Sequence, residues 1–105
     1  MGHAARTITG DIECEMRRQD SLWGADRHLP NGTSAHVYGA LMEHAKLVVE
    51  AATANNQLMW ADVLREEVFE VLAEEDPVKL QTELVQVAAV IGNWLKDLRS
   101  YGKDV

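Results

Sequence analysis

Apolar residues recur at three- and four-residue intervals along most of this chain, and this spacing limits the fold more than any other feature. Such intervals place apolar side chains on one face of an α-helix. A half-buried strand would require strict alternation of apolar and polar residues, which no segment sustains over a strand's length. Proline, which interrupts helices, occurs at Pro30 and Pro77. The pattern therefore predicts an all-α fold.

Capping and turn residues divide this pattern into four expected helices, at about 9–22, 35–54, 59–74 and 77–100. The segment 23–35 concentrates glycine, asparagine, serine and threonine with one proline, and is predicted to be a loop. Thr33 or Ser34 can cap the second helix, and Asp76 can cap a fourth helix that starts at Pro77. Short connections between helices predict a four-helix bundle-like subunit.

A chain of 105 residues has room for one domain. Residues 1–34 would supply an N-terminal helix and loop, and residues 35–100 the helical core. Val37 and Leu41 are expected to point inward from the second helix. The fourth helix is apolar on nearly every side between Leu84 and Ile91. A helix of this kind is normally buried, so we expect a subunit interface and a homo-oligomer, either a dimer or a tetramer.

The formal net charge of −7 argues against a nucleic-acid partner and against binding to anionic membranes. Cys14 is the only cysteine, which excludes an internal disulfide and fits a reducing compartment. The N-terminal residues lack the apolar stretch of a signal peptide, and the longest apolar runs are too short to span a membrane. We therefore expect a soluble, cytoplasmic protein.

Acidic residues gather on the third expected helix, within an arc of roughly 100° that contains no basic residue. These residues are Glu66, Glu67, Glu70 and Glu74. A turn at 75–77 would fold the fourth helix back antiparallel and bring Glu83 and Gln86 level with Glu70 and Glu67. A site built from oxygen ligands suits Mg²⁺ or Mn²⁺. The alternative is an ordinary solvated acidic face.

The same residues resemble a known motif. Glu66-Glu67-x-x-Glu70, twelve further residues and then Glu83-x-x-Gln86 are similar to the EExxE…ExxD signature of the all-α NTP pyrophosphatases, the MazG-like group. The resemblance covers about residues 35–98. It implies a helical homo-oligomer that uses Mg²⁺ to hydrolyse nucleoside triphosphates to a nucleoside monophosphate and pyrophosphate. The usual role of the group is to clean nucleotide pools.

The resemblance also implies roles for single residues. Glu67, Glu70 and Glu83 would bind the metal, and Glu66 would be a ligand or would orient the attacking water. Basic, aromatic and polar side chains elsewhere would contact the substrate. The candidates are Arg17, Trp23, Lys46 and Asn93, with Arg18, Lys79 and Trp60 as further possibilities, although the spacing of Trp60 favours a place in the core.

Gln86 departs from the signature, because it stands where the last aspartate is expected. An amide oxygen can bind a metal, but it brings one negative charge fewer than a carboxylate. Either Glu74 or a water fills the gap, or the substrate supplies more ligands, or catalysis is lost. A second hypothesis is therefore a catalytically weakened or inactive helical homodimer that binds a nucleotide or a protein partner. A third is a structural helical bundle.

Overall fold

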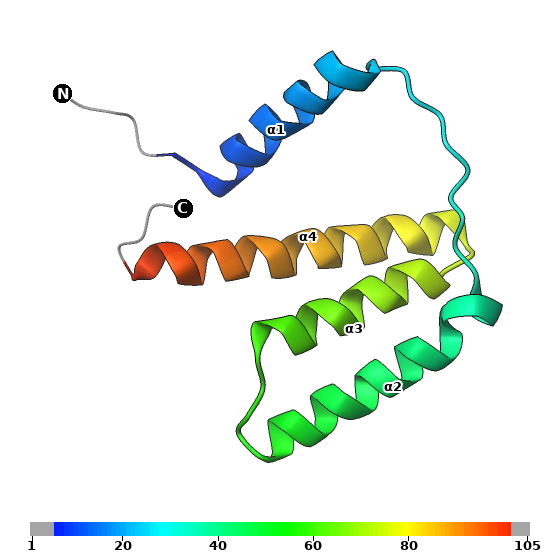
Figure 1. The fold of residues 1–105 in the computed structure, drawn as a ribbon, viewed down its shortest axis with the longest axis vertical. Coiled ribbons are helices and arrows are strands. Elements are labelled where there is room, and N and C mark those ends of the chain that lie inside the picture. Colours follow the sequence, from blue (N-terminus) through cyan, green and yellow to red (C-terminus); the bar gives the residue numbers. More distant parts are fainter. Residues whose placement is uncertain (1–5, 102–105) are drawn as a thin grey trace. The chain divides into compact units, whose positions relative to one another are not determined.

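A computed structural model describes residues 6–101, and within these residues the chain forms four α-helices and no strand (Figure 1). The helices are α1 (Ile8–Trp23), α2 (Ala35–Ala54), α3 (Trp60–Ala73) and α4 (Pro77–Ser100). The all-α prediction is confirmed. Residues 1–5 and 102–105 lie outside the described part, and the expectation about an N-terminal signal falls partly on them. None of the described helices is both long and apolar enough to cross a membrane.

Local capping hydrogen bonds decide where the helices begin. Thr7 caps α1, because its Oγ1 accepts a hydrogen bond from the Gly10 N–H at 2.9 Å, so α1 starts slightly earlier than its apolar spacing predicts. The Ser34 hydroxyl accepts from the Val37 N–H at 3.1 Å and confirms that Ser34 caps α2. Asp76 accepts from the Val78 N–H at 2.9 Å, directly before the first turn of α4.

The described residues form two compact units, one made of residues 31–94 and the other of residues 6–30 with 95–101. In the second unit, Asp11 near the start of α1 forms ion pairs with Arg6 and with Arg99 from the last turn of α4. The hydrogen bonds from Arg6 and then Arg99 lower the pKa of Asp11. The Arg27 guanidinium lies 5.7 Å from the centre of the Trp23 ring, in the loop after α1.

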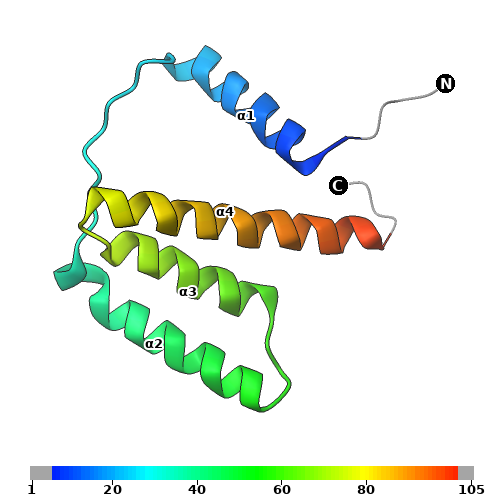
Figure 2. The ribbon, with the colours of Figure 1, turned by 180° about the vertical axis from the view of Figure 1, so that it is seen from behind.

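In the unit of residues 31–94, α2, α3 and α4 lie side by side with α3 in the middle (Figures 1 and 2). Ala45 on α2 and Ala73 on α3 are buried, and small side chains at such positions let two helices approach closely. The Trp60 and Trp94 rings stack at 6.3 Å between centroids and connect α3 with α4. The short connection through Pro77 makes these two helices antiparallel.

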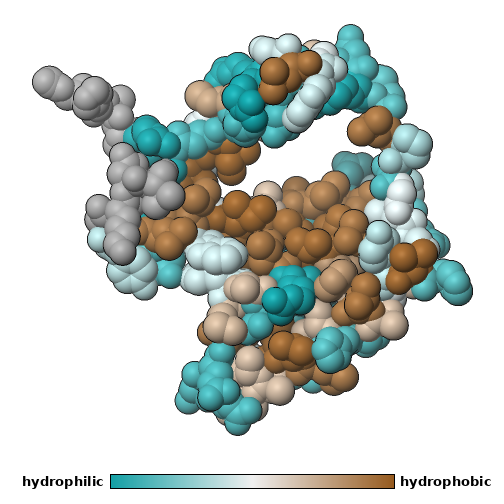
Figure 3. Space-filling view, in the orientation of Figure 1, coloured by the Kyte–Doolittle hydropathy of each residue, from teal (hydrophilic) through white to brown (hydrophobic). Residues whose placement is uncertain are grey.

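The three helices of this unit bury few of their own apolar side chains, because a single layer of helices has no second layer to pack against. Among the apolar residues that the structure describes, Ala45, Ala73 and Leu80 are the buried ones. Leu84 and Val85 on α4 are 50% and 68% exposed. In the space-filling view, apolar side chains form a continuous patch along α4 (Figure 3). Leu84 and Val85 belong to the segment for which the sequence predicts a subunit interface.

The expectation that Val37 and Leu41 point inward is wrong for this chain. Both side chains are exposed, at 58% and 46%. α2 contacts α3 through the side that carries Met42 and Ala45. At 100° per residue, Leu41 lies about 40° and Val37 about 80° from Ala45, so both lie at the edge of that contact or beyond it. Apolar side chains therefore occupy more of the α2 surface than one neighbouring helix can bury.

Candidate metal-binding site

Glu67, Glu70 and Glu83 come together where α3 and α4 lie side by side. One carboxylate oxygen of each residue lies within 4.8 Å of the corresponding oxygens of the other two. Glu67 and Glu70 are three residues apart on α3 and therefore share one face of that helix. The Asp76-Pro77 connection reverses the chain and brings Glu83 of α4 opposite that face. The sequence predicted this juxtaposition of three carboxylates.

Two oxygens of the cluster lack hydrogen-bond partners. The Oε2 atoms of Glu67 and Glu83 are buried, and neither accepts a hydrogen bond from any described residue. A buried carboxylate oxygen without a donor loses hydration without compensation, which costs about 1–3 kcal/mol or more. Native proteins contain few such atoms. A cation bound between the carboxylates would give both oxygens a partner.

Burial and the repulsion between carboxylates raise the pKa of two members of the cluster, Glu67 and Glu70. Desolvation is the largest cause that raises the pKa of Glu70 to about 7, followed by the negative charges of Glu67 and Glu83. The Lys46 ammonium works in the opposite direction. The pKa of Glu67 is also raised, first by desolvation and then by the charges of Glu66 and Glu83. Lys46 therefore offsets only part of the negative charge that the three carboxylates would carry together.

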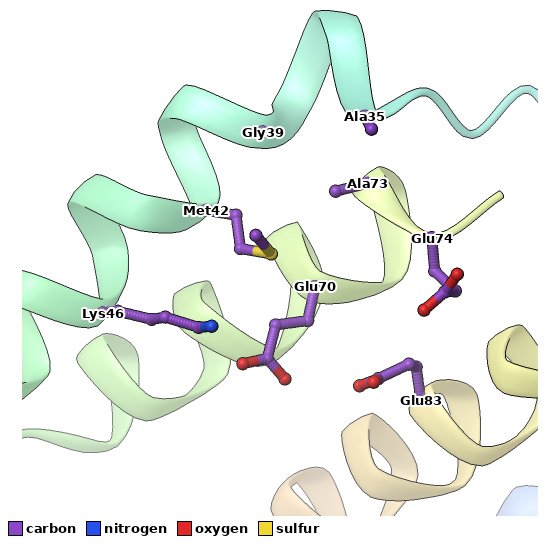
Figure 4. A pocket seen from close by; sticks show the side chains of 8 residues that line it. All are labelled: Ala35, Gly39, Met42, Lys46, Glu70, Ala73, Glu74 and Glu83. Carbon is purple, nitrogen blue, oxygen red and sulfur yellow. The ribbon is translucent and has the colours of Figure 1, made fainter.

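A cavity of about 250 Å³ opens between α2, α3 and α4 beside this cluster (Figure 4). Two kinds of residue line it. The charged residues are Lys46, Glu70, Glu74 and Glu83, and the uncharged ones are Ala35, Gly39, Met42 and Ala73. The Lys46 ammonium and the Glu70 and Glu83 carboxylates point into the same space (Figure 4). A cation and an anionic ligand could therefore meet in one cavity.

The other two motif residues have different positions. Glu66 is half-buried on α3 and acts on the cluster through its charge, which raises the pKa of both Glu67 and Glu70. Gln86 is exposed on α4, and it is not among the residues that line the cavity. A metal held by Glu67, Glu70 and Glu83 would therefore have three carboxylate ligands from the protein.

Of the predicted substrate residues, Lys46 lies in the cavity and Asn93 does not. Asn93 is exposed on α4, within the same unit. Arg17 and Trp23 are exposed on α1, which belongs to the other unit. Trp60 is half-buried and stacks on Trp94, so it has the packing role that its apolar spacing favours.

Sequence reasoning missed the uncharged lining of the cavity. Ala35, Gly39, Met42 and Ala73 carry no chemical group that would indicate a site. Gly39 offered one signal, because a glycine inside a helical pattern lowers helix stability and needs a packing or functional reason. Glu74, a candidate to fill the gap that Gln86 leaves in the motif, lies in the cavity wall with Glu70 and Glu83.

The donor set fits a hard divalent cation. Opposite ligands of Mg²⁺ lie about 4 Å apart, so oxygens within 4.8 Å of one another need to move little to surround it. Three carboxylates without a basic partner at hydrogen-bond distance also match the oxygen ligands that Mg²⁺ and Mn²⁺ prefer. The two buried, unpartnered oxygens would then gain the partner that they lack.

Comparisons of the chain with models of protein families, with curated proteins and with solved structures give no significant match.

Proposed function

We propose that this protein is a Mg²⁺-dependent nucleoside triphosphate pyrophosphohydrolase, with Mn²⁺ as a possible substitute. The observation that carries the proposal is the meeting of Glu67, Glu70 and Glu83, whose oxygens lie within 4.8 Å of one another at the positions that the EExxE…ExxD motif assigns to metal ligands. The substrate class comes from the resemblance of the motif.

The four motif glutamates and Lys46 can each be given a task in this reaction. Bound Mg²⁺ would supply positive charge to the phosphate oxygens and so let an acidic cavity accept an anionic substrate. Glu67, Glu70 and Glu83 would hold the ion. Lys46 would bind phosphate oxygens from the α2 side. Glu66 would orient the water whose oxygen attacks phosphorus, while the bond to the pyrophosphate leaving group breaks.

Assembly as a homo-oligomer is part of the proposal. Three helices in one layer leave Leu84 and Val85 largely exposed, and a helical layer normally covers such surface with a second layer. A second copy of the chain would supply that layer. Light scattering of the protein should give a mass of two or four chains, and a monomer at micromolar concentration would contradict this part.

The direct test is pyrophosphate release from a panel of canonical and modified nucleoside triphosphates in Mg²⁺ and in Mn²⁺. Glu67→Ala and Glu70→Ala should abolish release while the protein remains helical by circular dichroism. Glu13→Ala, which changes an exposed glutamate of α1, is the matched control and should keep full activity. Absence of release with every substrate and both ions would refute the enzymatic proposal.

One observation favours a second candidate function, a weakened enzyme that binds a nucleotide with little or no turnover. Gln86 replaces the last acidic residue of the motif, is exposed and does not line the cavity. The protein would then offer three carboxylates where the motif has more. Calorimetry that detects Mg²⁺-dependent triphosphate binding, together with no pyrophosphate release, would select this candidate over the enzyme.

A further inference from the structure

We propose that the uncharged half of the cavity, around Gly39, receives the nucleoside part of the substrate and that Gly39 limits its size. This inference rests on the proposed function and deepens it. The starting observation is the division of the cavity wall, with Lys46, Glu70, Glu74 and Glu83 on the charged side and Ala35, Gly39, Met42 and Ala73 on the other.

Gly39 has no packing reason to be glycine. A Cβ placed on Gly39 meets no atom within 4 Å beyond its own stretch of helix and its chain neighbours, among the residues that the structure describes. Close approach of two helices therefore does not explain this glycine. Its φ is not in the left-handed region either, since the positive-φ glycines of the described residues are Gly24 and Gly32.

Glycine at this position nevertheless lowers the stability of the helix. Glycine inside a helix is about 0.8–1.0 kcal/mol less favourable than alanine, and Gly39 lies one turn after the start of α2. What the missing side chain provides is open space, and that space belongs to the cavity. The structure thus links the missing side chain to room for a ligand.

The chemistry of this half excludes phosphate as its occupant. The start of α2 is a possible anion site, but two of its amides are already engaged: the Ala35 N–H donates to the Glu75 carboxylate at 3.0 Å, and the Val37 N–H donates to the Ser34 hydroxyl at 3.1 Å. The remaining lining presents methyl groups and the Met42 thioether, which cannot replace the hydration of a phosphate. An uncharged sugar and base fit this lining.

Continuity with the acidic cluster orients the ligand. Glu70 and Glu83 line the same cavity as Gly39, so a triphosphate held at the cation would extend its nucleoside toward α2 (Figure 4). The volume of about 250 Å³ is smaller than the roughly 300–1,000 Å³ of most ligand pockets. Added atoms at Gly39 would therefore compete directly with the nucleoside.

The test compares a nucleoside triphosphate with inorganic tripolyphosphate, which has the phosphates but no nucleoside. In Mg²⁺, Gly39→Leu should raise KM for the nucleoside triphosphate at least about tenfold, because filled space in a pocket is strongly discriminated. The Kd for tripolyphosphate should stay unchanged. His44→Leu, at an exposed position on the other side of α2, is the matched control and should change neither value.

Each outcome bears on one proposal. If the wild-type protein binds neither ligand, the proposed function fails. If it binds both, and Gly39→Leu weakens both equally or neither, the nucleoside does not lie at Gly39 and the proposed function stands. If Gly39→Leu loses helical content, Gly39→Ala is the deciding variant, because alanine favours the helix. Gly39→Ala should still raise KM for the nucleoside triphosphate about threefold. An unchanged KM for Gly39→Ala would overturn the inference.

Discussion

Replacing Glu70 with glutamine should stabilise the metal-free protein above neutral pH, although it removes a proposed metal ligand. Glu70 is a half-buried carboxylate that faces Glu67 and Glu83, and its pKa is about 7 instead of 4.5. At pH 8 the folded chain must therefore hold a negative charge in a place that disfavours it. Glutamine keeps the size and the hydrogen-bonding oxygen of the side chain without the charge.

The magnitude follows from the pKa. A rise from 4.5 to about 7 corresponds to a ceiling of about 3 kcal/mol, at about 1.36 kcal/mol per pKa unit. Glu70 is partly exposed, so solvent screening reduces this value, and we expect about 1–2 kcal/mol at pH 8. For a domain of this size the gain in Tm is roughly 5–10 °C.

The direction of the pH dependence is fixed by the same shift. A carboxyl whose pKa is higher in the folded state binds more protons there, so its contribution to stability is complete below the unfolded-state pKa of 4.5. That contribution is lost as pH rises through about 7. The wild-type protein should lose stability between pH 5 and pH 8 through this group, and the advantage of Glu70→Gln should shrink several-fold at pH 5.

The assay is thermal unfolding by circular dichroism in a chelator, at one protein concentration because Tm of an oligomer depends on concentration. Glu13→Gln, an exposed glutamate of α1, serves as the control and should leave Tm unchanged at both pH values. Adding Mg²⁺ should reverse the order of stability, since the ion would bind the wild-type cluster better. A Glu70→Gln protein that is equally or less stable at pH 8 without metal would refute the described crowding of carboxylates.

Two further predictions concern neighbouring residues. Gln86→Asp should leave the Mg²⁺ affinity, measured by calorimetry, within about twofold of the wild-type value, because Gln86 is exposed and does not line the cavity; markedly tighter binding would place residue 86 in the metal shell. Asp62→Ala should cost about 1–3 kcal/mol in urea unfolding, because the buried Asp62 carboxylate accepts the Met59 N–H at 3.1 Å and pairs with Arg65 at 3.4 Å. A loss below about 0.5 kcal/mol, the size of an ordinary surface change, would contradict that account.

Much of the helical framework could be predicted from the sequence, because helix boundaries depend on nearby residues. Ser34 and Asp76 cap their helices through hydrogen bonds that span two or three residues, so the sequence contains all partners of these bonds. The start of α1 was less accurate, since Thr7 lies outside the apolar spacing used to find the helix. The all-α class likewise follows from periodicity, which is a local property.

The candidate site was predicted in part for a similar reason. The i,i+3 spacing of Glu67 and Glu70 and the short Asp76-Pro77 connection are both readable from the sequence, and together they bring Glu83 within reach. The uncharged wall of the cavity was not predictable, because it depends on which side of α2 faces α3. The prediction that Val37 and Leu41 point inward was wrong for the same reason, because periodicity does not show how many neighbouring helices pack against a helix.

By itself, therefore, the sequence determined the four helices, their caps and the separation of the acidic residues along them. The tertiary structure alone decided that α2, α3 and α4 lie side by side and bury few side chains, that Lys46 and Gly39 of α2 share a cavity with Glu83 of α4, and that two glutamate oxygens are buried without partners. The reason is physical: capping and periodicity act within a few residues, whereas burial and desolvation depend on residues that are distant in the chain.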